Sequence, residues 1–249
     1  MDGKPILFSA PMVRALLDGS KTQTRRILKV PSGADFFSFD EAVDMEGIHH
    51  GPAAWFVDQD DLGLTPLFCP YGQPGDRLYV RENGWERPER TAKMMIEGAD
   101  TWEPYYYDAD GIDHHEVADF KEWGFKRRPS IHMPRWASRI TIEITDVRVE
   151  MLQDISGADA RAEGCKASPF PGPWWQGYRD MGDGSLSHQQ SIGETPPDWM
   201  IEPKRMRDHS HLDLSAIDAY RALWMRINGP GSWALNPWVW AVAFKMVKP

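Results

Sequence analysis

The sequence contains little cysteine and no long apolar run. Of its 249 residues, only Cys69 and Cys165 are cysteines. They form neither a CxxC pair nor a metal-binding spacing, and they are too few for a disulfide scaffold, which indicates a reducing, cytoplasmic environment. No apolar stretch approaches the length of a membrane span, and the run after residues 1–4 is too short for a signal peptide. We therefore expect a cytoplasmic protein that does not bind a membrane.

An excess of basic residues is also absent. The formal net charge of -9 argues against a protein that coats nucleic acid without specificity, because such binding needs many phosphate contacts. The basic residues nevertheless gather in two groups, which are Arg14, Lys21, Arg25, Arg26 and Lys29, and Lys121, Lys126, Arg127, Arg128, Arg135 and Arg139. A local basic pocket on an acidic protein suits a small anionic ligand or one short nucleic-acid segment.

Common metal and nucleotide motifs are missing. The chain has no HExxH pattern, no zinc-deaminase signature, no Walker A loop and no Rossmann glycine run. The segment from Asp113 to Glu116 (DHHE) contains metal-ligating residue types, but adjacent histidines on a strand point in opposite directions. A solvated loop is therefore the favoured interpretation, and the same reservation applies to His209 and His211. We expect no metal and no cofactor.

Tryptophan, by contrast, is abundant, with 12 in the chain. Those outside the most regular segments include Trp55, Trp85, Trp102, Trp123, Trp174, Trp175 and Trp199. Tryptophan in a long loop usually anchors the loop to the protein body, and less often it forms a stacking surface for a planar ligand. Both interpretations stay open for each residue.

Strands and short helices alternate along the chain. Hydrophobic runs and alternation predict strands at residues 5–9, 22–28, 77–81, 140–149 and 238–247. Helices are predicted from residue 10 to a stop at Gly19, at residues 156–163 before Gly164, and at residues 214–227. The alternation in residues 140–149 slips near Asp146, which indicates a β-bulge or a bend.

Three long stretches without sustained periodicity separate these elements, at about residues 31–74, 86–130 and 166–212. Stretches of that length are usually functional insertions. The predicted fold is therefore α+β: a single domain over residues 1–249, built as a small mixed β-barrel with flanking short helices and three long insertions.

The segment from Gly19 to Arg26 (GSKTQTRR) carries the densest chemistry. It combines an amine, hydroxyls and two guanidiniums just after the first predicted helix. In an extended chain Lys21 and Arg25 share one side, whereas a tight turn would let Lys21 and Thr24 converge. Such a cluster can hold an anion or activate a hydroxyl, and a solvated basic connection is the competing interpretation.

In this order the segments resemble the ASCH family, small β-barrels related to the PUA domains that bind modified RNA. The resemblance is carried by Gly19-x-Lys21-x-x-Thr24-x-Arg26, the Gly75-Asp76 turn with its strand, the long strand from Ile140, the helix with Glu163 and the final aromatic strand. The chain is most similar to phage-encoded members, through residues 5–9, 21–26, 75–82, 131–136 and 236–240. The resemblance implies a PUA-like barrel that recognises a nucleobase, here in the cytoplasm of a phage host.

Bacterial ASCH enzymes that hydrolyse N4-acetylcytidine are similar at residues 21–24, and they use a glutamate on the helix where Glu163 falls. The resemblance therefore implies a metal-free amidohydrolase with Lys21, Thr24 and Glu163 as its catalytic set. A desolvated lysine near other cations can act as the base for a hydroxyl, and a carboxyl can carry the proton to the leaving amine. The wider family often has Glu where this chain has Thr24, which is a departure from the pattern.

Other functions stay open at this point. A PUA-like domain can bind a modified base in RNA or DNA without chemistry, some ASCH proteins cleave single-stranded RNA, and Lys21 and Glu163 can simply form an ion pair. The expected partner is a modified nucleoside or a short single-stranded nucleic acid. The candidate substrate-binding residues are Arg25, Arg26, Tyr79, Glu82, Trp85, Arg135, Trp136 and Arg139. Core packing is the competing role for the aromatic ones, and a guanidinium laid over a ring is the competing role for Arg135 and Arg139.

Overall fold

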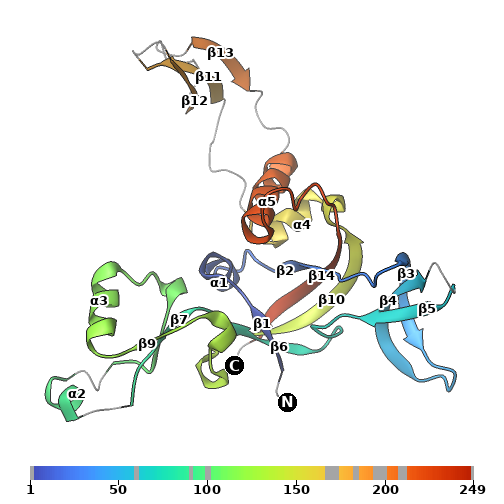
Figure 1. Cartoon of the computed structure of the whole chain (residues 1–249), viewed down its shortest axis with the longest axis horizontal. Coiled ribbons are helices and arrows are strands. Elements are labelled where there is room, and N and C mark those ends of the chain that lie inside the picture. The colour runs from blue at the N-terminus through green and yellow to red at the C-terminus, as the bar shows by residue number, and fades with distance from the viewer. Residues whose placement is uncertain are drawn as a thin grey trace. The chain divides into compact units, whose positions relative to one another are not determined.

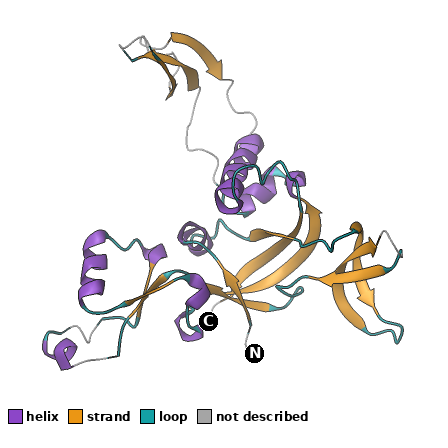
Figure 2. Ribbon diagram, in the orientation of Figure 1, coloured by secondary structure: helices purple, strands orange, loops and turns teal. Residues whose placement is uncertain are grey.

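The computed structural model describes residues 3–58, 62–89, 92–98, 102–165, 174–181, 185–192, 201–206 and 212–247 (Figure 1). It divides into two compact units. The first unit comprises Met1–Asp154, Ala162–Gly164 and Gly231–Pro249, and the second comprises Ile155–Arg161 and Cys165–Pro230. Strands predominate over a few short helices (Figure 2), which confirms the α+β class. None of the described helices is long and apolar enough to cross a membrane.

A five-stranded sheet organises the first unit, and its strands are those that the sequence predicts. In spatial order they are β1 (Lys4–Leu7), β6 (Arg77–Arg81), β10 (Thr141–Met151), β14 (Trp238–Val247) and β2 (Gln23–Ile27). β1 and β6 are parallel, and the other neighbours are antiparallel. The register of β10 against β14 shifts between Ile144 and Asp146, which confirms the expected bulge.

Alternate residues of these strands build the hydrophobic core. Ile142 and Ile144 before the bulge, and Val147 after it, are all buried. Neighbouring strands add Val80 and Val242 to the same cluster. The bulge explains why the buried positions change parity along β10, because one extra residue moves the following side chains to the opposite face.

The five-stranded sheet is open, and the expected closed barrel is not formed by the described residues. β1 and β2 are its two edges, and they share no backbone ladder. Instead, Nη2 of Arg26 in β2 donates a hydrogen bond of 2.7 Å to the backbone oxygen of Leu7 at the end of β1. β1 has only four residues before the chain turns into the next helix, so it offers little strand for a ladder with β2.

Helix α1 (Ala10–Leu17) connects β1 to β2 and lies where the sequence predicts it. Pro11 occupies the first turn, where its missing N–H costs nothing, and Gly19 follows the helix with a φ of 77°. Val13 and Leu16 are buried, whereas Leu17 is 46% exposed. The helix therefore presents a narrow apolar stripe to the core.

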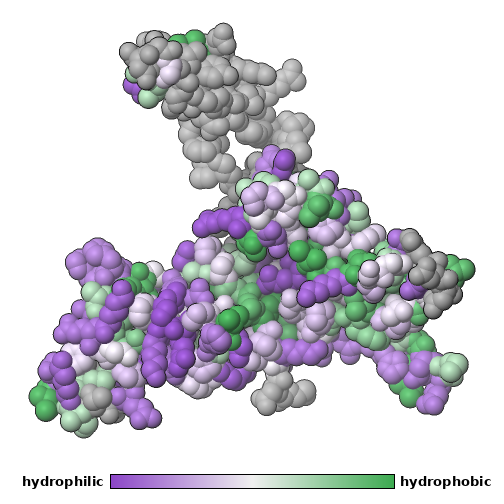
Figure 3. Space-filling view, in the orientation of Figure 1, coloured by the Kyte–Doolittle hydropathy of each residue, from purple (hydrophilic) through white to green (hydrophobic). Residues whose placement is uncertain are grey.

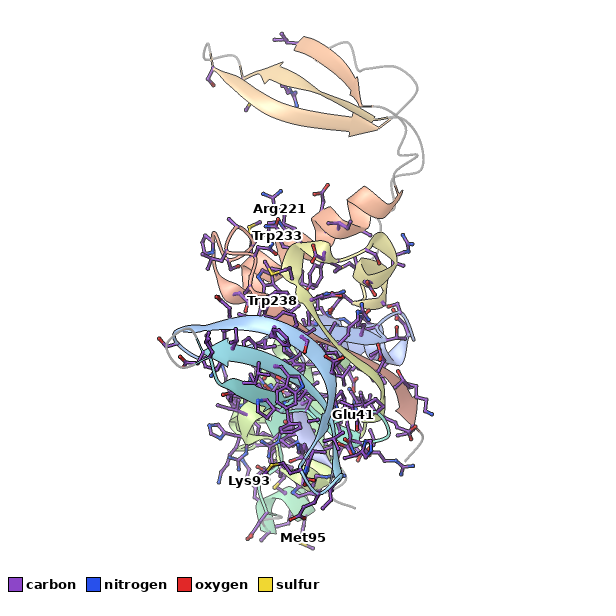
Figure 4. All side chains as sticks on the ribbon, turned by 90° about the vertical axis from the view of Figure 1, so that its right-hand side faces the viewer. Glu41, Lys93, Met95, Arg221, Trp233 and Trp238 are labelled. Atoms are coloured by element: carbon purple, nitrogen blue, oxygen red, sulfur yellow. The ribbon has the colours of Figure 1, made fainter. Side chains whose placement is uncertain are left out.

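The stretch at residues 31–74 is regular, contrary to the expectation. It forms an antiparallel sheet of β3 (Ala34–Val43), β4 (His49–Asp58) and β5 (Leu64–Phe68). Phe36 of β3 contacts Phe56 of β4 and packs with a tilted ring on Trp238 of β14, with ring centroids 4.1 Å apart. Trp238 is labelled in Figure 4. Register shifts at residues 36–38 and 42–43 interrupt the alternation, which explains why these strands escape a search for a period of two.

The stretch at residues 86–130 is also structured. A small sheet of β7 (Gly84–Glu86), β8 (Tyr105–Tyr107) and β9 (Lys126–Arg128) accompanies helices α2 (Ala92–Ile96) and α3 (His114–Glu122). Trp85, Phe120 and Phe125 form its buried aromatic cluster, against which Trp102 and Trp123 pack. Trp85, Trp102 and Trp123 therefore anchor this region. Mostly hydrophilic residues cover the surface over α3 and this sheet (Figure 3).

Short 3₁₀ helices complete the described part of the first unit: η2 (Asp108–Asp110), η3 (Ser130–His132), η4 (Arg135–Ala137) and η5 (Leu152–Asp154). The second unit contains the antiparallel sheet β12 (Leu186–Ile192), β11 (Trp174–Asp180) and β13 (Ile201–Met206), and helix α5 (Leu212–Asn228). Helix α4 (Gly157–Ala162) begins in the second unit and ends at the first residue of the segment 162–164. Three strands thus lie in the third stretch that the sequence leaves without elements.

Candidate functional site

The chain leaving α1 meets the chain leaving α4, and this contact builds the candidate site. The backbone N–H of Lys21 donates to the oxygen of Ala15, and that of Thr22 donates to the oxygen of Ala162, both at 2.8 Å. Lys21 and Glu163 form an isolated antiparallel β-bridge. Two residues that are 142 positions apart in the sequence therefore lie side by side.

Gly164 permits this close approach. Its φ is +87°, a backbone conformation that residues other than glycine rarely adopt. A β-carbon at this position would lie 2.9 Å from the β-carbon of Ala15 and 3.2 Å from that of Lys21. The glycine that ends α4 therefore has a second role, because it lets the following chain pack directly against the Lys21 backbone.

The Lys21 ammonium is enclosed and fully hydrogen-bonded. Its Nζ donates to Oε2 of Glu163 at 2.8 Å, to the backbone oxygen of Glu163 at 3.0 Å and to the backbone oxygen of Gln23 at 2.7 Å. The exposed fraction is 0% for the Lys21 side chain and 3% for that of Glu163. An ammonium has three protons, so these partners use all of them.

Arg25 extends the pair into a network of five charged side chains. Its Nη1 donates to Oε1 of Glu163 at 3.2 Å, and its Nε donates to Oε1 of Glu150 at 2.7 Å. Nε of Arg148 then donates to the other oxygen of Glu150 at 2.9 Å. Glu163 is therefore bound by one cation at each oxygen, an arrangement that offsets the cost of burying its charge.

Thr24 is buried next to this network but is not bonded to it. It lies opposite Val242 on β14, whereas Arg25 lies opposite Ala241, so the side chains of Thr24 and Arg25 leave β2 on opposite faces. In this structure the Thr24 hydroxyl makes no hydrogen bond to Lys21 or Glu163 within the described part of the chain. The extended alternative therefore describes this segment, and the tight turn that would join Lys21 to Thr24 is not formed.

Glu82 and Arg139, both proposed to bind substrate, are bonded to each other. Nε and Nη2 of Arg139 donate to the two oxygens of Glu82 at 3.0 and 3.1 Å, and the same guanidinium also pairs with Asp110. It lies 3.8 Å from the centroid of the Tyr107 ring. Glu82 is only 1% exposed. Burial raises the pKa of Glu82, and the hydrogen bonds from Arg139 oppose that rise.

This pKa shift predicts a pH dependence of stability. Just above the ordinary glutamate pKa, the folded protein keeps the Glu82 proton that the unfolded chain has lost. The contribution of Glu82 to the free energy of unfolding therefore falls as the pH rises through that range. Urea denaturation between about pH 4 and 6 measures this effect. The free energy of unfolding of the Glu82→Gln variant should lack the fall that the parent protein shows.

A suitable control is Glu143→Gln. The hydrogen bond from Lys245 lowers the pKa of Glu143, so its contribution to stability increases with rising pH. The two variants should therefore change the pH slope in opposite directions. Equal slopes for Glu82→Gln and the parent protein would contradict the raised pKa of Glu82.

The predicted aromatic residues have different environments. Trp85 is 8% exposed and packs on Phe120, so it contributes to the core rather than to an accessible slot. Trp136 is 57% exposed and lies edge-on to Tyr105. Together with Tyr105, Tyr106 and Tyr107 it lines a pocket of about 400 Å³. Of the two interpretations for Trp136, a stacking surface for a planar ligand therefore stays a prediction.

The guanidiniums that flank Trp136 along the chain contact other rings. The carbon Cζ of Arg135 lies 4.4 Å from the ring centroid of Tyr79, a side chain that is 9% exposed. Arg139 contacts Tyr107, as described above. Arg26 lies 5.5 Å from the ring centroid of Phe8 and bonds to Leu7. The arginines among the predicted substrate-binding residues therefore contact different rings: Arg135 contacts Tyr79, Arg139 contacts Tyr107 and Arg26 contacts Phe8.

The segment from Asp113 to Glu116 is the first turn of α3, not the solvated loop that the sequence favours. The Asp113 side chain accepts hydrogen bonds from the backbone N–H groups of His115 and Glu116, and Glu116 accepts one from the backbone of Asp113. Both carboxylates are thus used in a capping box. The residues that the structure describes contain no group of three or more potential metal ligands. His209 and His211 lie outside them.

Sequence reasoning missed three residues around these sites: Glu150, Arg148 and Arg81. Glu150 is separated from Arg148 by one residue in β10, so both point to the same face as Arg25 of β2. The available signal was that charged side chains alternate with apolar ones along these strands, which places them together on a polar face. Comparisons of the chain with family models, with curated proteins and with solved structures gave no match. The resemblance to the ASCH family therefore stays a prediction from its motifs.

Proposed function

We propose that this chain is a PUA-like, nucleobase-recognising protein of the ASCH type. Its proposed activity is metal-free amide hydrolysis that removes an acyl group from an N4-acylated cytosine nucleoside or a similar modified base. One observation carries the proposal: Lys21 and Glu163, which the resemblance names as catalytic, are in direct contact at 2.8 Å in a buried site. Thr24 lies three residues after Lys21 and is also buried.

The proposed reaction uses the Lys21–Glu163 pair as a proton carrier. Lys21 first passes one proton to Glu163, which leaves a neutral amine and a carboxylic acid. The Thr24 oxygen then bonds to the acyl carbon while its proton moves to Lys21. The C–N bond breaks as Glu163 returns its proton to the leaving N4 amine, and water then hydrolyses the acyl-threonine ester.

Substrate binding has to change two contacts before this reaction can begin. The Thr24 hydroxyl must reach Lys21, and one of the three acceptors around the Lys21 ammonium must give way. Catalytic hydrogen bonds are commonly absent or long without substrate and form in the substrate complex. Arg25 is placed to keep the Glu163 carboxyl oriented while its proton moves.

A second candidate is a binding module that recognises a modified base without chemistry. It is favoured by the complete hydrogen bonding of the Lys21 ammonium, which describes a stable structural ion pair as well as a resting catalytic one. Cleavage of single-stranded RNA with the same lysine is a further alternative from the resemblance.

One assay separates these candidates. The protein is incubated with N4-acetylcytidine, with cytidine as the product to be detected, and in parallel with a short single-stranded RNA containing N4-acetylcytidine. We expect cytidine and acetate from the nucleoside. Binding of the modified RNA with no product would favour the binding module, and shortened RNA would favour the nuclease.

A further inference from the structure

A pocket with two arginines opens at the β1 edge of the five-stranded sheet. Its volume is about 380 Å³, and it is lined by Pro5, Leu7, Arg26, Tyr71, Arg81 and Ile131. Leu7 of β1 lies opposite Arg81 of β6 in the parallel register, and Pro5 lies opposite Tyr79. These residues alternate with the buried Ile6 and Val80, so they share the outer face of the sheet.

The arginines at this pocket differ from most others in the first unit. Arg25, Arg127, Arg128, Arg139 and Arg148 each form an ion pair with a carboxylate. Within the described part of the chain, Arg26, Arg81 and Arg135 form none. Arg135 joins the group because it and Arg81 lie over the same Tyr79 ring, at 4.4 and 5.6 Å from its centroid. A protein with a net charge of -9 thus keeps three guanidiniums that have no carboxylate partner among the described residues.

Arg81 has an unused hydrogen-bonding edge. Its Nη1 donates to the backbone oxygen of Ile131 at 3.1 Å. Its Nε is shielded from solvent and has no hydrogen-bond partner among the described residues. A guanidinium characteristically binds phosphate with two parallel N–H groups, so an anionic oxygen that displaces the groups covering this Nε would satisfy the unpaired donor.

Arg26 connects this pocket to the candidate catalytic site. Its Cζ and the Nζ of Lys21 each lie 5.5 Å from the ring centroid of Phe8. Arg26 also follows Arg25, which binds Glu163. A ligand held by Arg26 would therefore be one aromatic ring away from Lys21.

We propose that the pocket lined by Arg26 and Arg81 binds the phosphate of a nucleotide, with the base against the apolar side chains of Leu7, Tyr71 and Ile131. Paired guanidiniums match a phosphate, and the apolar remainder of the wall matches a planar base. The ligand is thus a phosphorylated nucleoside rather than a free one. The assignment rests on the proposed function only in taking a cytosine as the base.

Isothermal titration calorimetry of the full chain tests this assignment with three probes: cytidine monophosphate, cytidine and inorganic phosphate. We expect cytidine monophosphate to bind at least about tenfold more tightly than cytidine, because charge-assisted hydrogen bonds to phosphate add that much or more. Arg81→Gln should reduce the affinity for the nucleotide to that for cytidine. Arg77→Gln is the matched control, since Arg77 lies on the same face of β6 outside this pocket, and it should leave the affinity unchanged.

Several results would overturn the assignment. Equal affinities for cytidine monophosphate and cytidine would exclude a phosphate site, and so would equal losses in the Arg81→Gln and Arg77→Gln variants. If inorganic phosphate binds as tightly as the nucleotide, the base contributes nothing to binding and the pocket is a simple anion site. A short single-stranded cytidine oligonucleotide, added as a further probe, distinguishes a polymer phosphate from that of a mononucleotide. Because binding is measured without turnover, absence of hydrolysis would refute the proposed function and leave this test intact.

Discussion

Replacing Lys21 with methionine is expected to lower the free energy of unfolding by about 3 kcal/mol, as measured by urea denaturation followed by tryptophan fluorescence. The methionine keeps the apolar stem but removes the cation, so Glu163 stays buried with Arg25 as its only cationic contact among the described residues. Removal of one partner from a buried ion pair is costly because the remaining charge is desolvated without compensation.

A double-mutant cycle separates this effect from simple loss of packing. The variant Lys21→Met with Glu163→Leu removes both charges, and it should be more stable than the Lys21→Met variant alone. Lys245→Met is the matched control, because Lys245 and Glu143 form an ion pair of 2.7 Å in which the lysine side chain is 60% exposed. Exposed pairs contribute at most about 1 kcal/mol, so this variant should lose little stability. Similar losses for Lys21→Met and Lys245→Met would show that the buried pair has no special role.

The second large effect concerns turnover. If the proposed function is correct, Glu163→Gln should lower the rate of N4-acetylcytidine hydrolysis by about 10²–10⁴-fold, which is the usual contribution of a general acid or base. Glutamine keeps the shape of the side chain and can still accept a hydrogen bond from Lys21, but it cannot carry the proton to the leaving amine. The release of cytidine, followed by chromatography, measures this loss.

Thr24→Val should reduce the same rate to a similar extent, because valine matches threonine in shape and lacks the hydroxyl. Ser20→Ala is its control: the Ser20 hydroxyl lies one residue before Lys21 but bonds only to Asp18 and the backbone oxygen of Ala15 in the described structure. Unchanged turnover in Thr24→Val would exclude Thr24 as the nucleophile. Unchanged turnover in Glu163→Gln would refute the proton-carrier role of the Lys21–Glu163 pair.

The regular elements of the first unit could be predicted because their signals are local. The helix that begins at Pro11 and stops before Gly19 follows from backbone preferences within a few residues. The bulge near Asp146 was visible as a slip in alternation. The strands at residues 34–68 were not predicted, because register shifts between β3 and β4 interrupt the alternation of buried and exposed residues. The contact of Phe36 with Trp238 depends on tertiary packing, which no local pattern indicates.

The candidate site was predictable only in part. The resemblance named Lys21 and Glu163, and their contact is consistent with that choice. No local pattern indicates that Glu150 binds Arg25 across 125 positions. Alternation in an extended chain does place Thr24 and Arg25 on opposite sides, but the sequence alone left the tight turn open as well. Glu82 and Arg139 were proposed as ligands for a substrate, yet they bind each other.

By itself, the sequence determined the strands of the five-stranded sheet, the helix before Gly19 and which chemical groups are present, because backbone propensity and hydrophobic period act over short distances. Only the tertiary structure decided which charges meet. Glu163 neutralises Lys21 because the chain leaving α4 runs beside the chain leaving α1. Arg26 and Arg81 line a pocket without carboxylate partners in the described part of the chain because Arg26, from the edge strand β2, reaches the end of the opposite edge strand β1, which pairs with β6 and its Arg81. Electrostatic pairing depends on distance in space, and that distance is set by strand order and register rather than by position in the sequence.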